Sequence, residues 1–236
     1  MANQEHFDVL EQGVDAWNKW RRNSPISPWP DLSGADLKGI DLSRGNLVEV
    51  SLGWADLRKA DLSKCDLFDA GLAGANLREA NLTGANLNEA LLREVDLSGA
   101  DLRWSNLSEA NLEGANLSEA TVGSTVFGRI DLSVVKGIDP VIHTGPSIIG
   151  IDTIYLSHGK ISDVFLQRAG VPGSFITYAH TLVSHPIDYY ACFISYSSQD
   201  KIFAKQLNED LQSKGGTLLV CAGRSQDWRP LPSTNR

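Results

Sequence analysis

The chain is poor in the features that mark membrane, secreted and metal-binding proteins. No apolar run approaches the about 18 residues that a membrane-spanning helix needs. The first residues, MANQEHFDVLEQG, lack the basic-then-apolar pattern of a secretory signal. The three cysteines, Cys65, Cys192 and Cys221, are odd in number and scattered, which predicts a reducing, cytoplasmic location without a disulfide framework. The histidines show no metal-ligand spacing such as H-E-x-x-H, so we expect no metal site and no cofactor.

Basic residues are also too few to balance the acidic ones. The 236 residues include 21 Lys and Arg against 29 Asp and Glu, for a net charge of −8. A mildly acidic chain has no general attraction to nucleic acid or to membrane surfaces. We therefore expect protein partners rather than nucleic acid or membrane, with the oligomeric state left open.

What the sequence does contain is a strict five-residue repeat from Pro30 to about Val134. Leucine recurs at every fifth position from Leu32 to Leu117, and Val122, Phe127 and Leu132 continue the period. The residue two places before each of these is small or apolar, usually alanine, and the residue between the two is mostly Asp or Asn. A helix face recurs near 3.6 residues and a strand face at 2, so a period of five fits neither. An unbroken repeat of this kind indicates stacked units with a shared core, formed by the Leu and Ala positions. Cys65 occupies an Ala position and is therefore expected to be a small buried side chain.

This A-(D/N)-L-x-x pattern resembles the pentapeptide-repeat family. The resemblance covers nearly half of the chain and implies a mainly β fold, a right-handed quadrilateral β-helix with four repeats, or twenty residues, per coil. The repeats would then form about five coils in a rod roughly 25 Å long.

The ends of such a rod expose backbone edges and apolar core, so they need to be covered. Residues 4–22 carry Phe7, Leu10, Val14 and Trp17 at helical spacing, and we interpret them as one N-terminal capping helix, with a partner-binding helix as the alternative. After Leu132 the sequence becomes rich in glycine and proline. A short strand or turn at 154–156 and short helices near 161–169 and 174–183 are predicted to follow.

Residues 189–215 change character once more. The apolar run at 191–196 is followed by a polar turn at 197–200 and by a pattern with Phe203, Leu207 and Leu211 on one helix face. The segment FISYSSQD, together with this predicted helix, resembles the first strand and first helix of a bacterial Toll/interleukin-1 receptor (TIR) domain. A complete TIR domain is an α/β fold with NAD-cleaving or adaptor functions. Nothing here matches its catalytic glutamate, so we assign no catalytic residue and predict that the chain is not an enzyme.

The tail from about Gly216 does not continue the TIR pattern. Codons can be chosen for residues 216–230 that, read one base later, encode VRCWFAPEDLKIGDR, which is similar to the second strand and loop of a TIR domain. One hypothesis is therefore an out-of-frame tail on a truncated pentapeptide–TIR protein. The alternative is a diverged natural tail.

These observations divide the chain into five segments. They are a capping helix and linker at 1–29, the pentapeptide β-helix at 30–134, a linker with short helices at 135–187, a truncated TIR-like α/β fragment at 188–215, and the possibly out-of-frame tail at 216–236.

Twenty residues per coil would stack outward side chains in columns. One column is acidic and ends at Arg129, and two apolar residues fall in the column beside it. We predict that these residues bind a basic partner: Glu49, Asp69, Glu89, Glu109, Val48 and Phe68. Basic residues form other columns, one with Lys38, Arg58 and Arg78 and one with Arg44 and Lys64. A solvated surface without a selected partner is the alternative.

Three functions follow from these patterns. The first is a non-enzymatic interaction scaffold in signal transduction. The second is the remnant of a TIR-type NAD hydrolase without activity. The third is a DNA mimic that protects a topoisomerase, which some pentapeptide proteins do, although the repeats mix basic residues among the acidic ones.

Overall fold

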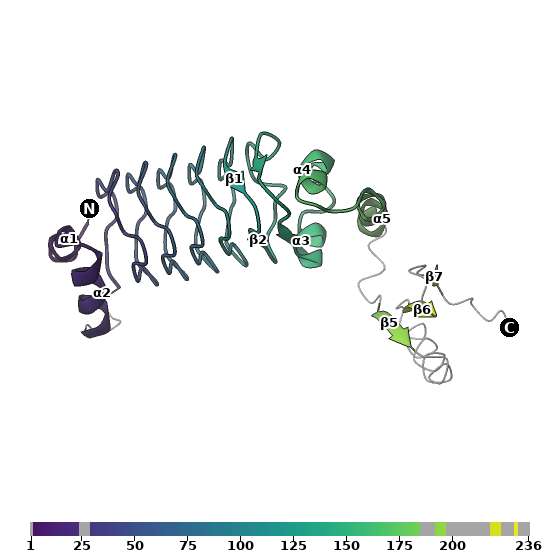
Figure 1. The fold of residues 1–236 in the computed structure, drawn as a ribbon, viewed down its shortest axis with the longest axis horizontal. Coiled ribbons are helices and arrows are strands. Elements are labelled where there is room, and N and C mark those ends of the chain that lie inside the picture. Colours follow the sequence, from purple (N-terminus) through teal and green to yellow (C-terminus); the bar gives the residue numbers. More distant parts are fainter. Residues whose placement is uncertain (1, 24–28, 185–191, 197–217, 223–228, 231–236) are drawn as a thin grey trace. The chain divides into compact units, whose positions relative to one another are not determined.

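The computed structural model describes residues 2–23, 29–184, 192–196, 218–222 and 229–230 (Figure 1), with side chains described up to residue 180. Residues 1–177 form one compact unit and residues 178–236 form a second.

The first unit is a rod built from stacked coils (Figure 1). From Asp31 to Asn106, every residue at the Asp or Asn position forms a parallel β-bridge with the residue 20 positions later, beginning with Asp31 and Ser51. Since these bridges recur every five residues, each coil has four sides, and residues 31–130 make five complete coils. This arrangement confirms a repeat β-solenoid. The right-handed sense of the coil remains an implication of the resemblance.

Each five-residue repeat closes with a tight turn. The amide of the Ala position donates to the carbonyl of the leucine three residues earlier, as from Ala85 to Leu82 at 3.0 Å. From Gly34 to Arg129, the second residue after each leucine position has a positive φ, as the third residue of a type II turn does, and this conformation favours glycine. Fourteen non-glycine residues of the rod, from Arg44 to Arg129, nevertheless adopt this conformation. The Asp or Asn before the leucine accepts from the amide two residues on, as from Ser63 to Asp61 at 2.9 Å, which explains the preference for these two residues.

The core consists of the leucine and alanine columns. Side chains from Leu32 to Leu132 at the leucine position are no more than 3% exposed, and nearly all residues at the Ala position are buried as well. The predicted inward and outward register is therefore observed. Cys65 is buried in this core, and its thiol donates to the carbonyl of Leu42 at 2.7 Å.

The N-terminal cap consists of two helices, α1 (Gln4–Glu11) and α2 (Val14–Asn23), rather than the single helix that we predicted. Gly13 separates them with a φ of 98°, a conformation that glycine adopts without a steric penalty. Of the predicted apolar face, Leu10 and Trp17 are buried, whereas Phe7 and Val14 are half-buried.

These helices satisfy the open backbone edge of the first coil with side chains. The Trp17 indole donates to the carbonyl of Asn46 at 2.8 Å, and Asn18 accepts from the amide of Asn46 at 2.7 Å while donating to the carbonyl of Arg44 at 3.1 Å. On another side, the amide of Asp31 donates to Nδ1 of His6 at 3.0 Å. The predicted capping role is thus supported by specific hydrogen bonds.

The solenoid continues beyond the predicted boundary at 134. Asn116 bridges to Lys136, strand β1 (Thr121–Val122) pairs in parallel with β3 (Ile142–His143), and β2 (Val126–Phe127) pairs with β4 (Ile148–Ile149). The offset grows from 20 to 21 and then 22 residues, so the coil path is kept while the sequence period is lost. The glycine- and proline-rich stretch therefore holds another partial coil.

Helices α3 (Ile151–Leu156) and α4 (Asp163–Arg168) follow at this end of the rod (Figure 1). Helix α5 (Gly173–Ser184) comes next and reaches into the second unit. The prediction of a strand or turn at 154–156 is wrong, because these residues lie in α3, where Ile154 is buried. The helices predicted near 161–169 and 174–183 correspond to α4 and α5.

In the second unit, the described residues form one sheet of three strands in the order β5 (Cys192–Tyr196), β6 (Leu218–Ala222) and β7 (Arg229–Pro230). β5 pairs in parallel with β6, and β6 pairs antiparallel with β7. A parallel pair needs a connection of about a dozen or more residues, and the sequence separation of β5 and β6 is long enough for one. The predicted turn at 197–200 and the helix with Phe203, Leu207 and Leu211 lie outside the described residues.

Candidate functional site

The predicted acidic column is assembled by the turns on one side of the rod, which we call the acidic side. Glu49, Asp69, Glu89 and Glu109 are twenty residues apart, and each has a φ between 51° and 61° at the same turn position. Their amides hydrogen-bond to the next coil, as from Glu89 to the carbonyl of Ser108 at 3.0 Å. Coils in a parallel ladder are spaced by roughly 4.8 Å, so the carboxylates project from neighbouring levels of a rigid wall.

The two apolar residues expected beside this column are less accessible than we predicted. Val48 and Phe68 are both half-buried. Helix α2 approaches Val48, whose carbonyl accepts from Nη2 of Arg21 at 2.7 Å. Phe68 belongs to the second coil, one coil away from the contact between α2 and Val48.

Basic residues balance both ends of the acidic column. Arg21 interacts electrostatically with Glu49; burial lowers the pKa of Arg21, and the Glu49 carboxylate opposes this shift. At the other end, Arg129 forms an ion pair with Glu109 at 3.8 Å. Within the described residues, Asp69 and Glu89 form no ion pair. The unbalanced charge of the column is therefore concentrated at its centre, next to Phe68.

The basic column differs because two of its three side chains, those of Arg58 and Arg78, pair with neighbouring carboxylates. Arg58 forms an ion pair with Asp56 of its own repeat at 2.5 Å, and this contact lowers the pKa of the Asp56 carboxyl through a side-chain hydrogen bond. Arg78 pairs with Asp96 at 3.5 Å. These guanidinium groups are partly neutralised by the chain itself, which leaves the basic column less available to a charged partner than the acidic side.

Two exposed tryptophans were not selected from the sequence. Trp54 is 73% exposed and Trp104 is 68% exposed, and each occupies the positive-φ position of a turn. The six-membered ring of Trp54 lies against Gly74, where an added Cβ would come within 2.7 Å of three ring carbons. The sequence pattern could have predicted that both side chains point outward. Only the leucine and alanine positions of the five-residue repeat point inward, and the tryptophans occupy neither.

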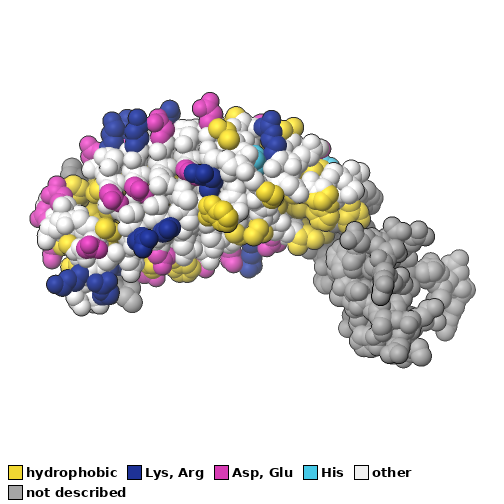
Figure 2. All heavy atoms as spheres, viewed as in Figure 1, with side chains coloured by type: hydrophobic (Ala, Val, Ile, Leu, Met, Phe, Trp, Pro, Cys, Tyr) yellow, Lys and Arg dark blue, Asp and Glu magenta, His cyan; other side chains and the backbone are white. Residues whose placement is uncertain are grey.

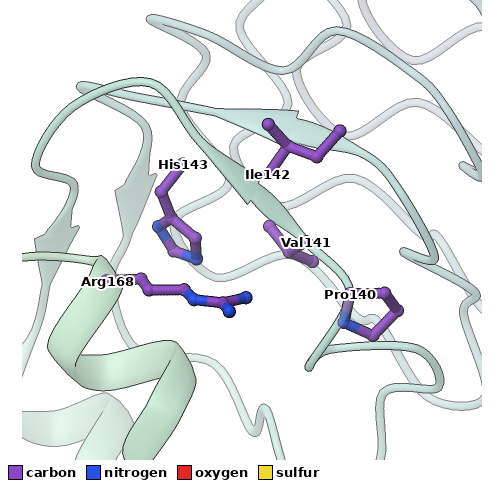
Figure 3. A pocket seen from close by; sticks show the side chains of 5 residues that line it. All are labelled: Pro140, Val141, Ile142, His143 and Arg168. Carbon is purple, nitrogen blue, oxygen red and sulfur yellow. The ribbon is translucent and has the colours of Figure 1, made fainter.

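At the C-terminal end, a pocket of about 400 Å³ is lined by Pro140, Val141, Ile142, His143 and Arg168. His143 comes from β3 and Arg168 from α4, and their side chains lie next to each other (Figure 3). In the described part of the chain, no group of His, Cys, Asp and Glu side chains could hold a metal ion. Nor is any described helix long and apolar enough to cross a membrane.

The family profile for pentapeptide repeats matches the chain from residue 31 to residue 133. The chain therefore belongs to the pentapeptide-repeat proteins, as the four-sided coils indicate. The matched region does not include residues 188–215, so the TIR resemblance is not supported by this comparison.

Similar solved structures are pentapeptide-repeat proteins. HetL from the cyanobacterium Nostoc sp. strain PCC 7120, involved in heterocyst differentiation regulation, is 40% identical over 43% of this chain and 47% of its own, with a TM-score of 0.32. Alr5209 from Nostoc PCC 7120 is 34% identical over 44% of this chain and 84% of its own, with a TM-score of 0.37. QnrB1, a plasmid-mediated fluoroquinolone resistance protein, is 22% identical over 51% of this chain and 70% of its own, with a TM-score of 0.33.

The chain spans about half the length of HetL. A comparison with curated proteins returned no match.

Proposed function

We propose that this chain is a non-enzymatic interaction scaffold whose rod binds a basic protein partner through the acidic side. The observation that carries the proposal is the unbalanced centre of the carboxylate column, where Asp69 and Glu89 form no ion pair in the described structure and Phe68 lies alongside. The carboxylates would steer a basic partner toward the rod, and the apolar contact would add burial that charge alone does not provide.

The test reverses the charge at the centre of the column with the double change Asp69→Lys and Glu89→Lys. Both side chains lie outside the leucine core, so the fold is expected to persist, which thermal melting would verify. Capture of the partner from a cell lysate is expected to fall. The wild-type complex is expected to weaken as salt rises, because exposed charges are screened beyond about 8–10 Å at physiological ionic strength.

A matched control reverses the basic column with Lys38→Glu, Arg58→Glu and Arg78→Glu. Under the proposal this triple variant keeps the partner. If the triple variant loses capture while the double variant retains it, the partner binds the basic side and the proposed face is incorrect.

Topoisomerase protection by DNA mimicry is the alternative function, and the charges of the rod argue against it. Ion pairs join adjacent coils between Lys59 and Glu79 at 3.3 Å and between Arg93 and Glu113 at 3.1 Å. Basic and acidic side chains are interspersed on the visible face of the rod (Figure 2). A DNA mimic needs phosphate-like acidity along its length, which these pairs interrupt. A topoisomerase assay with added protein distinguishes the two functions, because the scaffold proposal predicts no effect.

We further propose that residues 188–215 derive from a TIR signalling module, which a shift of reading frame interrupts at about residue 216. The parallel pairing of β5 with β6 fits the start of an α/β fold, although β6 lies inside the segment that the hypothesis treats as out of frame. Sequencing the encoding DNA tests this directly. The expected result is a TIR-like continuation in the frame one base later, and a shifted frame without one would rule the hypothesis out. An NAD turnover assay is expected to be negative in either case.

A further inference from the structure

The last turn of the solenoid places a histidine at a position that is otherwise apolar. His143 of β3 is paired with Val122 of β1, and Val122 continues the column of Leu42, Leu62, Leu82 and Leu102. These five side chains are no more than 1% exposed. The column therefore ends in an imidazole ring where the repeat would place a leucine.

The surroundings of this ring suit a neutral side chain. Both ring nitrogens of His143 are buried and have no hydrogen-bond partner among the described residues. The ring packs edge-on against Phe165 of α4, with centroids 5.0 Å apart. Phe165 also packs edge-on against Phe127 at 5.8 Å, so this one residue of α4 contacts side chains of two core columns.

The charged group that acts on the imidazole is the guanidinium of Arg168, and its positive charge repels a protonated ring. Arg168 lines the pocket together with His143 (Figure 3). Its Nη1 donates to the carbonyl of Asp139 at 3.2 Å. The neighbours contributed by the coil, Val122 and Val141, are apolar and buried. Burial lowers the pKa of His143 most, and the positive charge of Arg168 lowers it further.

Helices α3 and α4 and the residues that join them, which we call the C-terminal cap, also hold the open backbone edge of the rod on other sides of the coil. The amide of Leu132 donates to Oγ of Ser157 at 2.9 Å, and the amide of Ile130 donates to Oγ1 of Thr153 at 3.3 Å. The end of α4 is attached through the amide of Ser147, which donates to the carbonyl of Ala169 at 3.0 Å. Opening of the cap would break these bonds and expose the ends of the apolar columns.

We propose that His143 makes the C-terminal cap pH-sensitive: protonation of its ring favours release of the cap from the end of the rod. In the open state the imidazole is hydrated and takes an ordinary histidine pKa of about 6.5. In the closed state the pKa is lower, so between the two values the open state binds more protons. The closed cap is therefore fully stable above about pH 6.5 and loses stability as the pH falls toward the lowered value. This device is independent of the partner-binding proposal.

Amide hydrogen exchange on the full chain measures the opening directly. After correction for intrinsic exchange rates, we expect the protection factors of the Leu132 and Ile130 amides to fall about tenfold or more between about pH 7.5 and about pH 5. The Leu82 amide, which donates to the carbonyl of Asp101 at 2.8 Å within the middle coils, serves as the internal control and should stay protected. Unchanged protection of Leu132 and Ile130 over this range would overturn the proposal.

Two variants assign the effect to the ring. His143→Leu restores the repeat and is expected to keep the cap closed at both pH values, and His143→Gln offers a second side chain that cannot be protonated. Arg168→Gln removes the repelling charge and raises the pKa of His143 in the closed state toward its open-state value, so the loss of protection at low pH is expected to become smaller. If His143→Leu and His143→Gln lose protection over the same pH range as the wild type, another group is responsible and the proposal fails.

Discussion

Leu91 and Leu92 are neighbours in the chain, yet they lie on opposite sides of the coil wall. Leu92 is fully buried in its leucine column, whereas Leu91 is 48% exposed at the bridging position that Asp or Asn occupies in most repeats. Leu91 bridges to Gly71 and to Asn111, so it keeps the backbone role of the position without the side-chain hydrogen bond. The same residue type therefore experiences two environments at consecutive positions, which allows a matched test of the register.

Leu92→Asp is expected to destabilise the rod severely, and Leu91→Asp is expected to be nearly silent. The first change buries an unpaired carboxylate in the core, at a cost of about 3 to 5 kcal/mol in the free energy of unfolding. The second provides a carboxylate that can accept from the amide two residues on, as Asp96 does from Ser98 at 3.0 Å. Thermal melting of the two variants checks the register, and equal losses would contradict it.

Gly84→Ala is expected to cost about 1 kcal/mol of stability, because Gly84 has a φ of 70° and a side chain there is strained. Space is not the reason, since the added Cβ would lie 3.5 Å from Cγ of Lys64, an ordinary contact. Gly74→Ala should cost more, because the Trp54 ring must also move. Denaturant unfolding of both variants measures these effects. A neutral Gly84→Ala would show that the turns do not discriminate between glycine and other residues.

Asn18→Ala is expected to destabilise the docking of the N-terminal cap by about 1 to 3 kcal/mol. The change removes the hydrogen bonds of Asn18 to the carbonyl of Arg44 and to the amide of Asn46, and it leaves both backbone groups without these partners. The measurement is protection of the Asn46 amide from hydrogen exchange. Asn23→Ala, at the exposed end of α2, is the matched control and should have little effect. Equal behaviour of the two variants would mean that the cap is held by apolar packing alone.

Cys65 is expected to resist alkylation in the folded protein. Burial raises the pKa of its thiol to about 12, so little of the reactive thiolate forms at neutral or mildly basic pH. In a chain with Cys192→Ser and Cys221→Ser, thiol labelling should proceed only after denaturant unfolds the rod. Rapid labelling under native conditions would show that the coil opens locally around Cys65. Cys65→Ala should remain folded, because alanine is the usual residue at this position of the repeat.

The sequence alone predicted the acidic column of the candidate site. A period of twenty residues is enough to align Glu49, Asp69, Glu89 and Glu109, and the structure has the same repeat spacing. The sequence did not indicate that Arg21 approaches Glu49, because this contact depends on how α2 docks on the first coil. For the same reason, the half-burial of Val48 could not be predicted from a pattern confined to the rod.

The sequence by itself determined the solenoid, because every coil repeats the same local requirements. An inward leucine, a small residue two places earlier and an Asp or Asn that binds its own turn all act within a few residues, so their period directly encodes the fold. The tertiary structure alone decided the two ends. Gly13 divides the N-terminal cap, and β3 and β4 extend the solenoid after the period is lost. His143 enters a leucine column only because a longer loop restores the coil path, and such a register shift is fixed by backbone pairing between distant residues.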